Sequence, residues 1–155
     1  MRFSETQVYL RVKKFLADSN WSVVAGQPPS GSDHLPVIEI KDPLIRSKGS
    51  LGSFKPDMLA WRENILLIVE LKSMFTLSDV DKLNTILDSE ERKSELWDEI
   101  NSRNLRLRSG ENLANFRLNT EIVGGLGYGG DLKRVPGFMH FVVHQERVLE
   151  YDLRE

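Results

Sequence analysis

Residues 55–72 have the sequence KPDMLAWRENILLIVELK, and this stretch decides the fold. Two apolar runs, Pro56–Trp61 and Ile65–Lys72, stand on either side of a short polar segment. Both runs are apolar on both faces, which is typical of strands that are covered on two sides of a sheet. The intervening Arg62-Glu63-Asn64 favours a tight turn, because Asn tolerates the positive φ that such turns need. The stretch therefore predicts a buried β-hairpin.

Charged residues stand near the open end of this hairpin. Side chains alternate along a strand, so Glu70 and Lys72 share one face. Burying either charge is expensive unless it is paired or bound to a metal. If the turn is centred between Glu63 and Asn64, Asp57 lies directly opposite Glu70, with β-carbons about 4.5–5.5 Å apart. A three-residue loop would shift the pairing by one residue and separate the two carboxylates.

Two opposed carboxylates repel each other, and a divalent cation would turn that repulsion into a shared site. Oxygen ligands suit Mg²⁺, which typically takes one or two carboxylates together with waters and substrate phosphate. The alternative is a surface ion pair between Glu70 and Lys72 beside an unrelated Asp57.

A third carboxylate belongs to the amphipathic helix predicted over residues 4–18. Glu5 lies on the same helical stripe as Val8 and Val12, so we expect it to point inward at the edge of the core. The alternative is that Glu5 only stabilises the first helical turn, where acidic side chains favour the helix dipole.

The rest of the chain predicts an α/β (α+β) fold with a central mixed β-sheet flanked by helices. Strands are expected at 21–25, 35–40 and 116–123, a final hairpin at 138–144 and 147–153, and loops at 26–34 and 42–54. A helix is expected from residue 78 to 105. The charged segment at 88–95 is interpreted as its solvated face rather than as a break between two helices.

Composition restricts the function classes. The chain has 155 residues, which is the size of one domain over 1–155. Its 21 Lys and Arg against 23 Asp and Glu exclude a protein that binds nucleic acid by bulk charge alone. The absence of cysteine excludes disulfides and thiolate metal sites. No signal peptide or membrane-spanning run is visible, so we expect an intracellular, cytoplasmic protein without a membrane partner.

The hairpin motif resembles that of a known enzyme family. Pro56-Asp57 followed by Glu70-Leu71-Lys72, with the helix of Glu5 before it and a helix after it, resembles the PD-(D/E)xK nuclease superfamily. The resemblance covers roughly residues 3–105 in its order of elements. It implies a restriction-endonuclease-like core.

The resemblance also implies roles for individual residues. Asp57, Glu70, the backbone carbonyl of Leu71 and the helix residue Glu5 would be ligands of Mg²⁺, for which Mn²⁺ could substitute. Asp57, Glu70 and Lys72 would form the catalytic set, with Lys72 orienting the attacking water and stabilising charge on the phosphate. These roles agree with phosphodiester hydrolysis, which needs a nucleophile near neutral pH and a cation at the developing charge.

A glycine-rich segment, 125–130, contains the spacing G-x-G-x-x-G. A dinucleotide fingerprint requires a helix directly after it, and the segment 133–137 (KRVPG) breaks a helix. We interpret this region as a loop, with Tyr128, Lys133 and Arg134 available for nucleic-acid contacts.

The expected function is therefore a metal-dependent nuclease, an endonuclease on DNA. Two alternatives stay open: the catalytic subunit of a larger transposition or phage-defence complex, and a non-catalytic nucleic-acid-binding module that keeps the fold. RNA cleavage and junction resolution also stay open, because the motif recognises phosphate rather than sequence. Cutting both strands of double-stranded DNA needs two active sites, which favours a homodimer.

Overall fold

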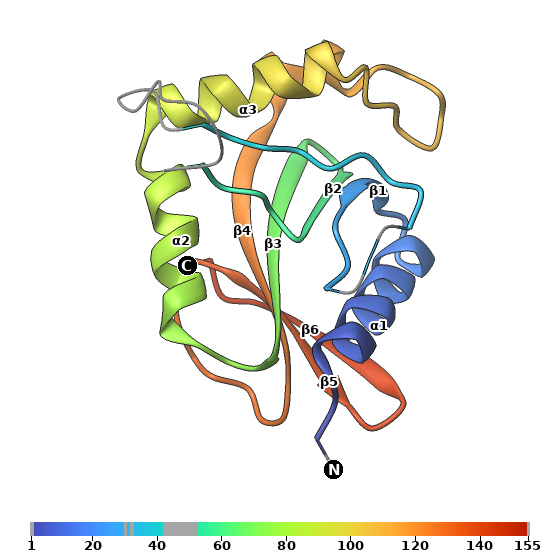
Figure 1. The fold of residues 1–155 in the computed structure, drawn as a ribbon, viewed down its shortest axis with the longest axis vertical. Helices are drawn as coiled ribbons and strands as arrows, with labels where there is room; N and C mark the ends of the chain where they lie inside the picture. Colours follow the sequence, from blue (N-terminus) through green and yellow to red (C-terminus); the bar gives the residue numbers. More distant parts are fainter. Residues whose placement is uncertain (1, 30, 32, 42–52, 155) are drawn as a thin grey trace.

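The computed structural model describes residues 2–29, 31, 33–41 and 53–154, so most of the loop expected at 42–54 lies outside the described residues. One six-stranded sheet organises the described chain, with helices on both of its sides (Figure 1). The elements are α1 (Glu5–Asp18), β1 (Ser22–Gly26), β2 (Met58–Arg62), β3 (Ile65–Met74), α2 (Leu77–Leu87), α3 (Glu90–Ser102), the 3₁₀-helix η1 (Leu113–Asn119), β4 (Glu121–Gly129), β5 (Met139–His144) and β6 (Arg147–Asp152). The strands lie side by side in chain order, with β3–β4 and β4–β5 parallel and the other pairs antiparallel. The expected α+β class with a mixed sheet flanked by helices is confirmed.

The hairpin of β2 and β3 has the expected register. Arg62 pairs with Ile65, and Met58 pairs with Val69. The two residues of the turn, Glu63 and Asn64, have positive φ angles of 49° and 66°. This is the conformation of a two-residue hairpin turn, whose twist matches that of the strands.

Strand β3 is buried on both faces, as its apolar run predicts. Leu66 and Ile68 belong to the core beneath α2 and α3, whereas Leu67 and Val69 belong to the core beneath α1. Helix α1 lies on one side of the sheet and α2 and α3 lie on the other (Figure 1). Glu70, two residues beyond Ile68, therefore continues the face that α2 covers.

The prediction of a single helix at 78–105 is wrong. Helix α2 ends at Leu87, and Ser89 begins α3 by accepting a hydrogen bond from the backbone N–H of Arg92. A serine hydroxyl that caps a new helix satisfies N–H groups that a continuous helix would have bonded internally. No helix in the described ranges is long and apolar enough to cross a membrane.

Two further strands differ from expectation. Residues 35–40 form no strand; Ile40 makes an isolated bridge to Phe54, although Ile38 and Ile40 are buried in the core. The strand expected at 116–123 begins later, because Leu113–Asn119 is a 3₁₀-helix and β4 runs from Glu121.

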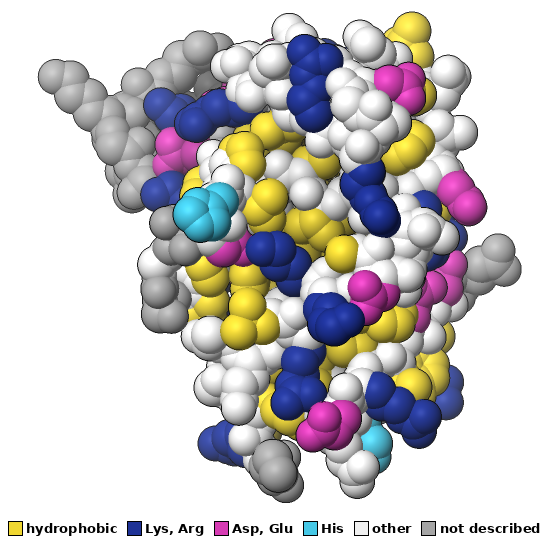
Figure 2. Space-filling model, turned by 90° about the vertical axis from the view of Figure 1, so that its right-hand side faces the viewer, with side chains coloured by type: hydrophobic (Ala, Val, Ile, Leu, Met, Phe, Trp, Pro, Cys, Tyr) yellow, Lys and Arg dark blue, Asp and Glu magenta, His cyan; other side chains and the backbone are white. Residues whose placement is uncertain are grey.

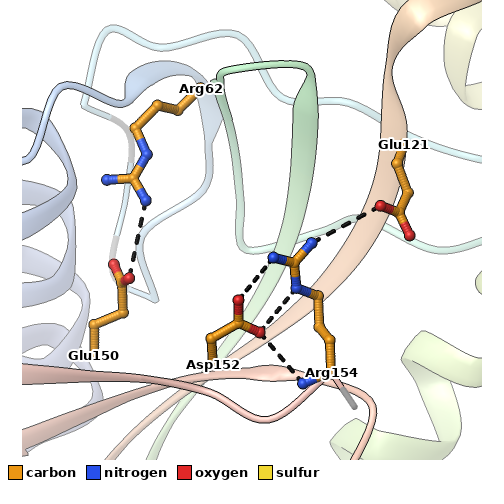
Figure 3. A network of polar contacts seen from close by, with 5 residues as sticks. All are labelled: Arg62, Glu121, Glu150, Asp152 and Arg154. Carbon is orange, nitrogen blue, oxygen red and sulfur yellow. Dashed lines mark hydrogen bonds and ion pairs between the residues drawn. The ribbon is translucent and has the colours of Figure 1, made fainter.

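The final hairpin, β5 with β6, forms as expected around its turn at 145–146. Polar contacts connect it to distant strands (Figure 3). Arg62 lies 3.9 Å from Glu150, and Arg154 binds Asp152 at 2.7 Å and lies 3.8 Å from Glu121. These ion pairs join β6 and the residues after it to the end of β2 and the start of β4.

Candidate metal centre and active site

The structure brings Asp57 and Glu70 side by side. The backbone N–H of Asp57 donates to Glu70 Oε2 at 3.0 Å, and the backbone N–H of Leu71 donates to Asp57 Oδ2 at 2.8 Å. The Glu70 carboxylate thus accepts from the chain directly before β2, and the Asp57 carboxylate accepts from β3. The side chain of Glu70 is only 4% exposed. The opposition expected from the hairpin register is confirmed.

Burial and mutual repulsion make this pair reluctant to ionise. Burial, followed by the nearby charge of Asp57, raises the pKa of Glu70 to about 8. Burial raises the pKa of Asp57 to about 6, although the hydrogen bond from Leu71 and the charge of Lys72 act in the opposite direction. At neutral pH, a cation bound between the two carboxylates would replace the proton that Glu70 otherwise retains.

We expect the metal-free protein to lose stability as pH rises because of this pair. Unperturbed Asp and Glu titrate near pH 4, so between about pH 5 and pH 8 the folded state holds more protons than the unfolded one. The stabilisation from these raised pKa values is present below the unfolded pKa and is lost as pH rises through about 6 to 8. Thermal denaturation in EDTA at several pH values measures the effect.

Glu70→Gln is the reference in that experiment, because His140 changes the stability of the fold with pH in the opposite direction. Burial lowers the pKa of His140, so this residue stabilises the fold as pH rises. The melting temperature of the wild type minus that of Glu70→Gln should therefore fall with pH. A difference that stays constant would contradict the raised pKa of Glu70.

Lys72 is directed by an irregularity in β3. Leu71 pairs with Gly127 and Met74 with Gly129, so β3 has one extra residue at this point. Such bulges occur beside active sites, where they redirect a side chain. Lys72 Nζ lies 3.6 Å from Glu5 Oε1, and the neighbouring carboxylates raise the pKa of Lys72 although burial acts to lower it. Lys72 is therefore a charged ammonium group at the end of β3.

Glu5 reaches the site, as its helical stripe predicted. It begins α1, where Ser4 and Gln7 form a capping box. Its carboxylate forms an ion pair with Lys72 rather than facing Asp57 and Glu70 directly. A role for Glu5 as a metal ligand stays a prediction, whereas its contact with Lys72 is a feature of the structure.

Asp79 is a site residue that sequence reasoning missed. It lies in the first turn of α2, is 3% exposed, and its Oδ1 has no hydrogen-bond partner among the described residues. Burial raises its pKa, and the charge of Lys72 and a hydrogen bond from Thr76 act against this rise. In the sequence, the spacing Thr76-x-x-Asp79 matches that of a capping box, although Thr76 makes no side-chain cap hydrogen bond in the structure. Only the placement of α2 shows that this carboxylate faces the same charges.

The donor set fits a hard cation. Within the described ranges, no group of three or more His, Cys, Asp or Glu side chains is gathered closely enough to hold a metal ion. Mg²⁺, however, often uses only one or two carboxylates and keeps several waters. The two backbone hydrogen bonds use Asp57 Oδ2 and Glu70 Oε2, and Glu70 Oε1 lies 3.9 Å from Lys82 Nζ. A cation would therefore use Asp57 Oδ1 and would compete with the Lys82 ammonium group for Glu70 Oε1. The Leu71 carbonyl as a ligand stays a prediction.

The glycine-rich segment is not a loop, and Tyr128 is not a surface residue. Residues 125–129 belong to β4, and Tyr128 is 1% exposed. Its hydroxyl lies 2.7 Å from His140 Nδ1 and accepts a hydrogen bond from the backbone N–H of Lys133. The expected contact of Tyr128 with nucleic acid is therefore wrong on grounds of burial. Lys133 and Arg134 are exposed after β4, as expected, and their role stays a prediction.

The site thus combines the buried carboxylate of Glu70 and the half-buried carboxylate of Asp57 with an ammonium group that Glu5 contacts. This arrangement can bind a divalent cation and stabilise negative charge that develops beside Lys72. A scan of protein-family models, a search of curated proteins and a search of solved structures each found no match to this chain.

Proposed function

We propose that the chain is a metal-dependent nuclease that hydrolyses phosphodiester bonds of DNA, with Mg²⁺ as cofactor and Mn²⁺ as a substitute. The observation that supports this proposal is the hydrogen bond that the backbone N–H of Asp57 donates to the Glu70 carboxylate. Glu70 and Lys72 lie on the same strand, β3, two residues apart. A buried carboxylate, Glu70, beside the half-buried carboxylate of Asp57 destabilises a fold unless something compensates the two charges. Phosphodiester hydrolysis would use such an arrangement, because the carboxylates can hold a cation that activates water and stabilises charge on the phosphate.

Each residue has a defined task in this proposal. Asp57 Oδ1 and Glu70 Oε1 would hold the cation. A divalent ion at that position lowers the pKa of water and neutralises charge on the phosphate. Lys72 donates hydrogen bonds to the attacking water and to the phosphate, whose negative charge grows in the transition state. Glu5 orients the Lys72 ammonium group, and Asp79 helps to keep that group protonated.

We expect Glu5→Gln to lower kcat by about tenfold while metal affinity changes less than about twofold. The reason is that Glu5 contacts Lys72, so its loss misplaces a group that acts in the chemical step. Steady-state cleavage and calorimetric titration with Mn²⁺ measure the two quantities.

Glu90→Gln is the matched control for this variant, because Glu90 also lies in a first helical turn and also pairs with a lysine, Lys93. A large loss of Mn²⁺ affinity in Glu5→Gln would instead make Glu5 a metal ligand. Activity equal to that of the control would show that Glu5 only stabilises the first turn of α1 and has no role in cleavage.

The direct test is incubation of the purified protein with plasmid DNA, linear duplex, branched DNA and RNA, each with and without Mg²⁺ or Mn²⁺. We expect cleavage of DNA that requires the metal and is absent in Glu70→Gln. Metal-independent binding without cleavage of any substrate would favour a non-catalytic nucleic-acid-binding module or a subunit that acts only within a complex.

A further inference from the structure

A hollow opens where β3 and β4 end, and we call it the terminal hollow. It has a volume of about 390 Å³, and its lining includes Arg2, Phe3, Met74, Phe75, Asp131 and Lys133. Ser73, another lining residue, directly follows Lys72 in β3. The segments that form it lie together at the lower end of Figure 1, where the N-terminus and the connections after β3 and β4 meet.

Apolar side chains form a substantial part of this surface, namely Phe3, Met74 and Phe75. The Met74 side chain is 49% exposed. Phe75 packs edge-on against Tyr128 at 5.4 Å, which holds its ring in place. Since Phe75 follows Lys72 by three residues, its backbone is at most about 10 Å away along the chain.

Cations stand beside these apolar groups. Arg2 and Lys133 are exposed, and Asp131 is the one acidic residue that lines the terminal hollow among the residues that the structure describes. A second hollow of about 550 Å³ shares Phe3 and Asp131 with it and extends to Arg11, whose guanidinium lies over the Phe3 ring at 5.0 Å. Figure 2 shows the side of the molecule that carries α1, where Lys and Arg side chains are spread from top to bottom with apolar side chains between them.

We propose that the terminal hollow binds an unpaired nucleotide next to the phosphate that is cleaved, so that the substrate is single-stranded or locally unpaired DNA. This inference rests on the nuclease function proposed above. A duplex presents phosphates and base edges, and the faces of its bases are covered by stacking. Only an unpaired base can place its face on Phe75 and Met74 while its phosphate meets Arg2 or Lys133. Apolar and aromatic groups beside a cationic groove are the combination by which proteins hold single strands.

Fluorescence anisotropy with labelled oligo(dT), a blunt duplex and a duplex with a single-stranded overhang tests the proposal, with Ca²⁺ in place of Mg²⁺. We expect the wild type to bind the single strand and the overhang at least about fivefold more tightly than the blunt duplex, the lower limit for one stacked base. Met74→Ala should remove part of this preference. Arg2→Ala/Lys133→Ala should reduce the salt dependence of single-strand binding, with a slope smaller by about 1.4 for two lost phosphate contacts.

Matched controls come from the far end of the molecule. Lys93 and Arg117 line a different hollow, so Lys93→Ala/Arg117→Ala removes two charges elsewhere, and Leu118→Ala matches Met74→Ala as an exposed apolar residue. These variants should retain the wild-type preference. Equal affinity for blunt and unpaired substrates, or equal losses in hollow and control variants, would overturn the inference.

The outcome is distinguishable from failure of the nuclease proposal. Metal-dependent cleavage that is unchanged by substitution of Arg2, Met74 and Lys133 would refute nucleotide binding in the terminal hollow and would support the nuclease function. Single-strand preference that depends on the terminal hollow, without cleavage of any substrate, would support the binding site and refute the catalytic role.

Discussion

Replacing Lys72 by alanine is expected to lower the rate of DNA cleavage by roughly 10²-fold or more. In the proposed mechanism its ammonium group acts on charge that appears in the transition state, so its loss affects the chemical step more than substrate binding. The variant should still bind Mn²⁺, because Asp57 and Glu70 remain. It should also still bind DNA in the presence of Ca²⁺. Single-turnover cleavage, calorimetry and anisotropy measure these three properties.

Lys93→Ala is the control that separates catalysis from the loss of an ion pair. The Lys72 and Lys93 side chains are 34% and 26% exposed, and each contacts one glutamate, at 3.6 and 2.9 Å. Both substitutions should cost little stability, because partly exposed ion pairs contribute about 0–1 kcal/mol. Only Lys72→Ala should lose activity, and Lys72→Arg should not restore it fully, since a guanidinium is bulkier and presents its N–H donors in a fixed planar fork. Wild-type cleavage by Lys72→Ala would falsify the catalytic assignment.

The central hairpin could be predicted because its determinants are local. The apolar pattern placed both strands, and the turn at Glu63 and Asn64 set the register that brings Asp57 to Glu70. With a two-residue turn, one assumption about its centre determines every pair along the hairpin. This is why the pair of carboxylates could be located before the structure was known.

Elements that depend on distant contacts were predicted less well. Strand β4 is rich in glycine, which has low strand propensity, yet it pairs with β3 on one side and β5 on the other. A β-carbon at Gly127 would collide with the end of the Leu71 side chain, so glycine at this position makes room for that side chain. Nothing within residues 125–130 alone indicates either neighbour.

The same limit explains which part of the site was missed. Helix α2 carries Asp79 and Lys82, which lie near the carboxylates of Asp57 and Glu70. The positions of Asp79 and Lys82 depend on how the chain turns after β3. Sequence periodicity shows which face of a helix is apolar, but not which end of the sheet its first turn approaches. The break between α2 and α3 at Ser89 was hidden for a related reason, since a capping serine inside a charged run resembles a solvated helix face.

Asp57→Asn is expected to remove the stabilisation that Mn²⁺ gives to the fold. A ligand at about 100 times its dissociation constant stabilises a protein by about 2.7 kcal/mol, which appears as a rise in melting temperature. Loss of a group that only supports a metal ligand typically costs 10- to 100-fold in affinity, so loss of one of two carboxylate ligands should cost roughly 10²-fold or more. At a metal concentration of about 100 times the wild-type dissociation constant, the variant should therefore keep at most about 0.4 kcal/mol of this stabilisation and lose most of the rise.

The same variant should be at least as stable as the wild type when metal is absent at about pH 8. Repulsion from Asp57 is the second cause of the raised pKa of Glu70, and asparagine removes that charge while its amide oxygen can still accept the N–H of Leu71. Asp152→Asn is the contrasting control, because Asp152 pairs with Arg154, which lowers its pKa (Figure 3). It should reduce stability without metal and keep the full rise with Mn²⁺. An undiminished rise in Asp57→Asn would show that the two carboxylates share no cation, and the repulsion between them would then need another explanation.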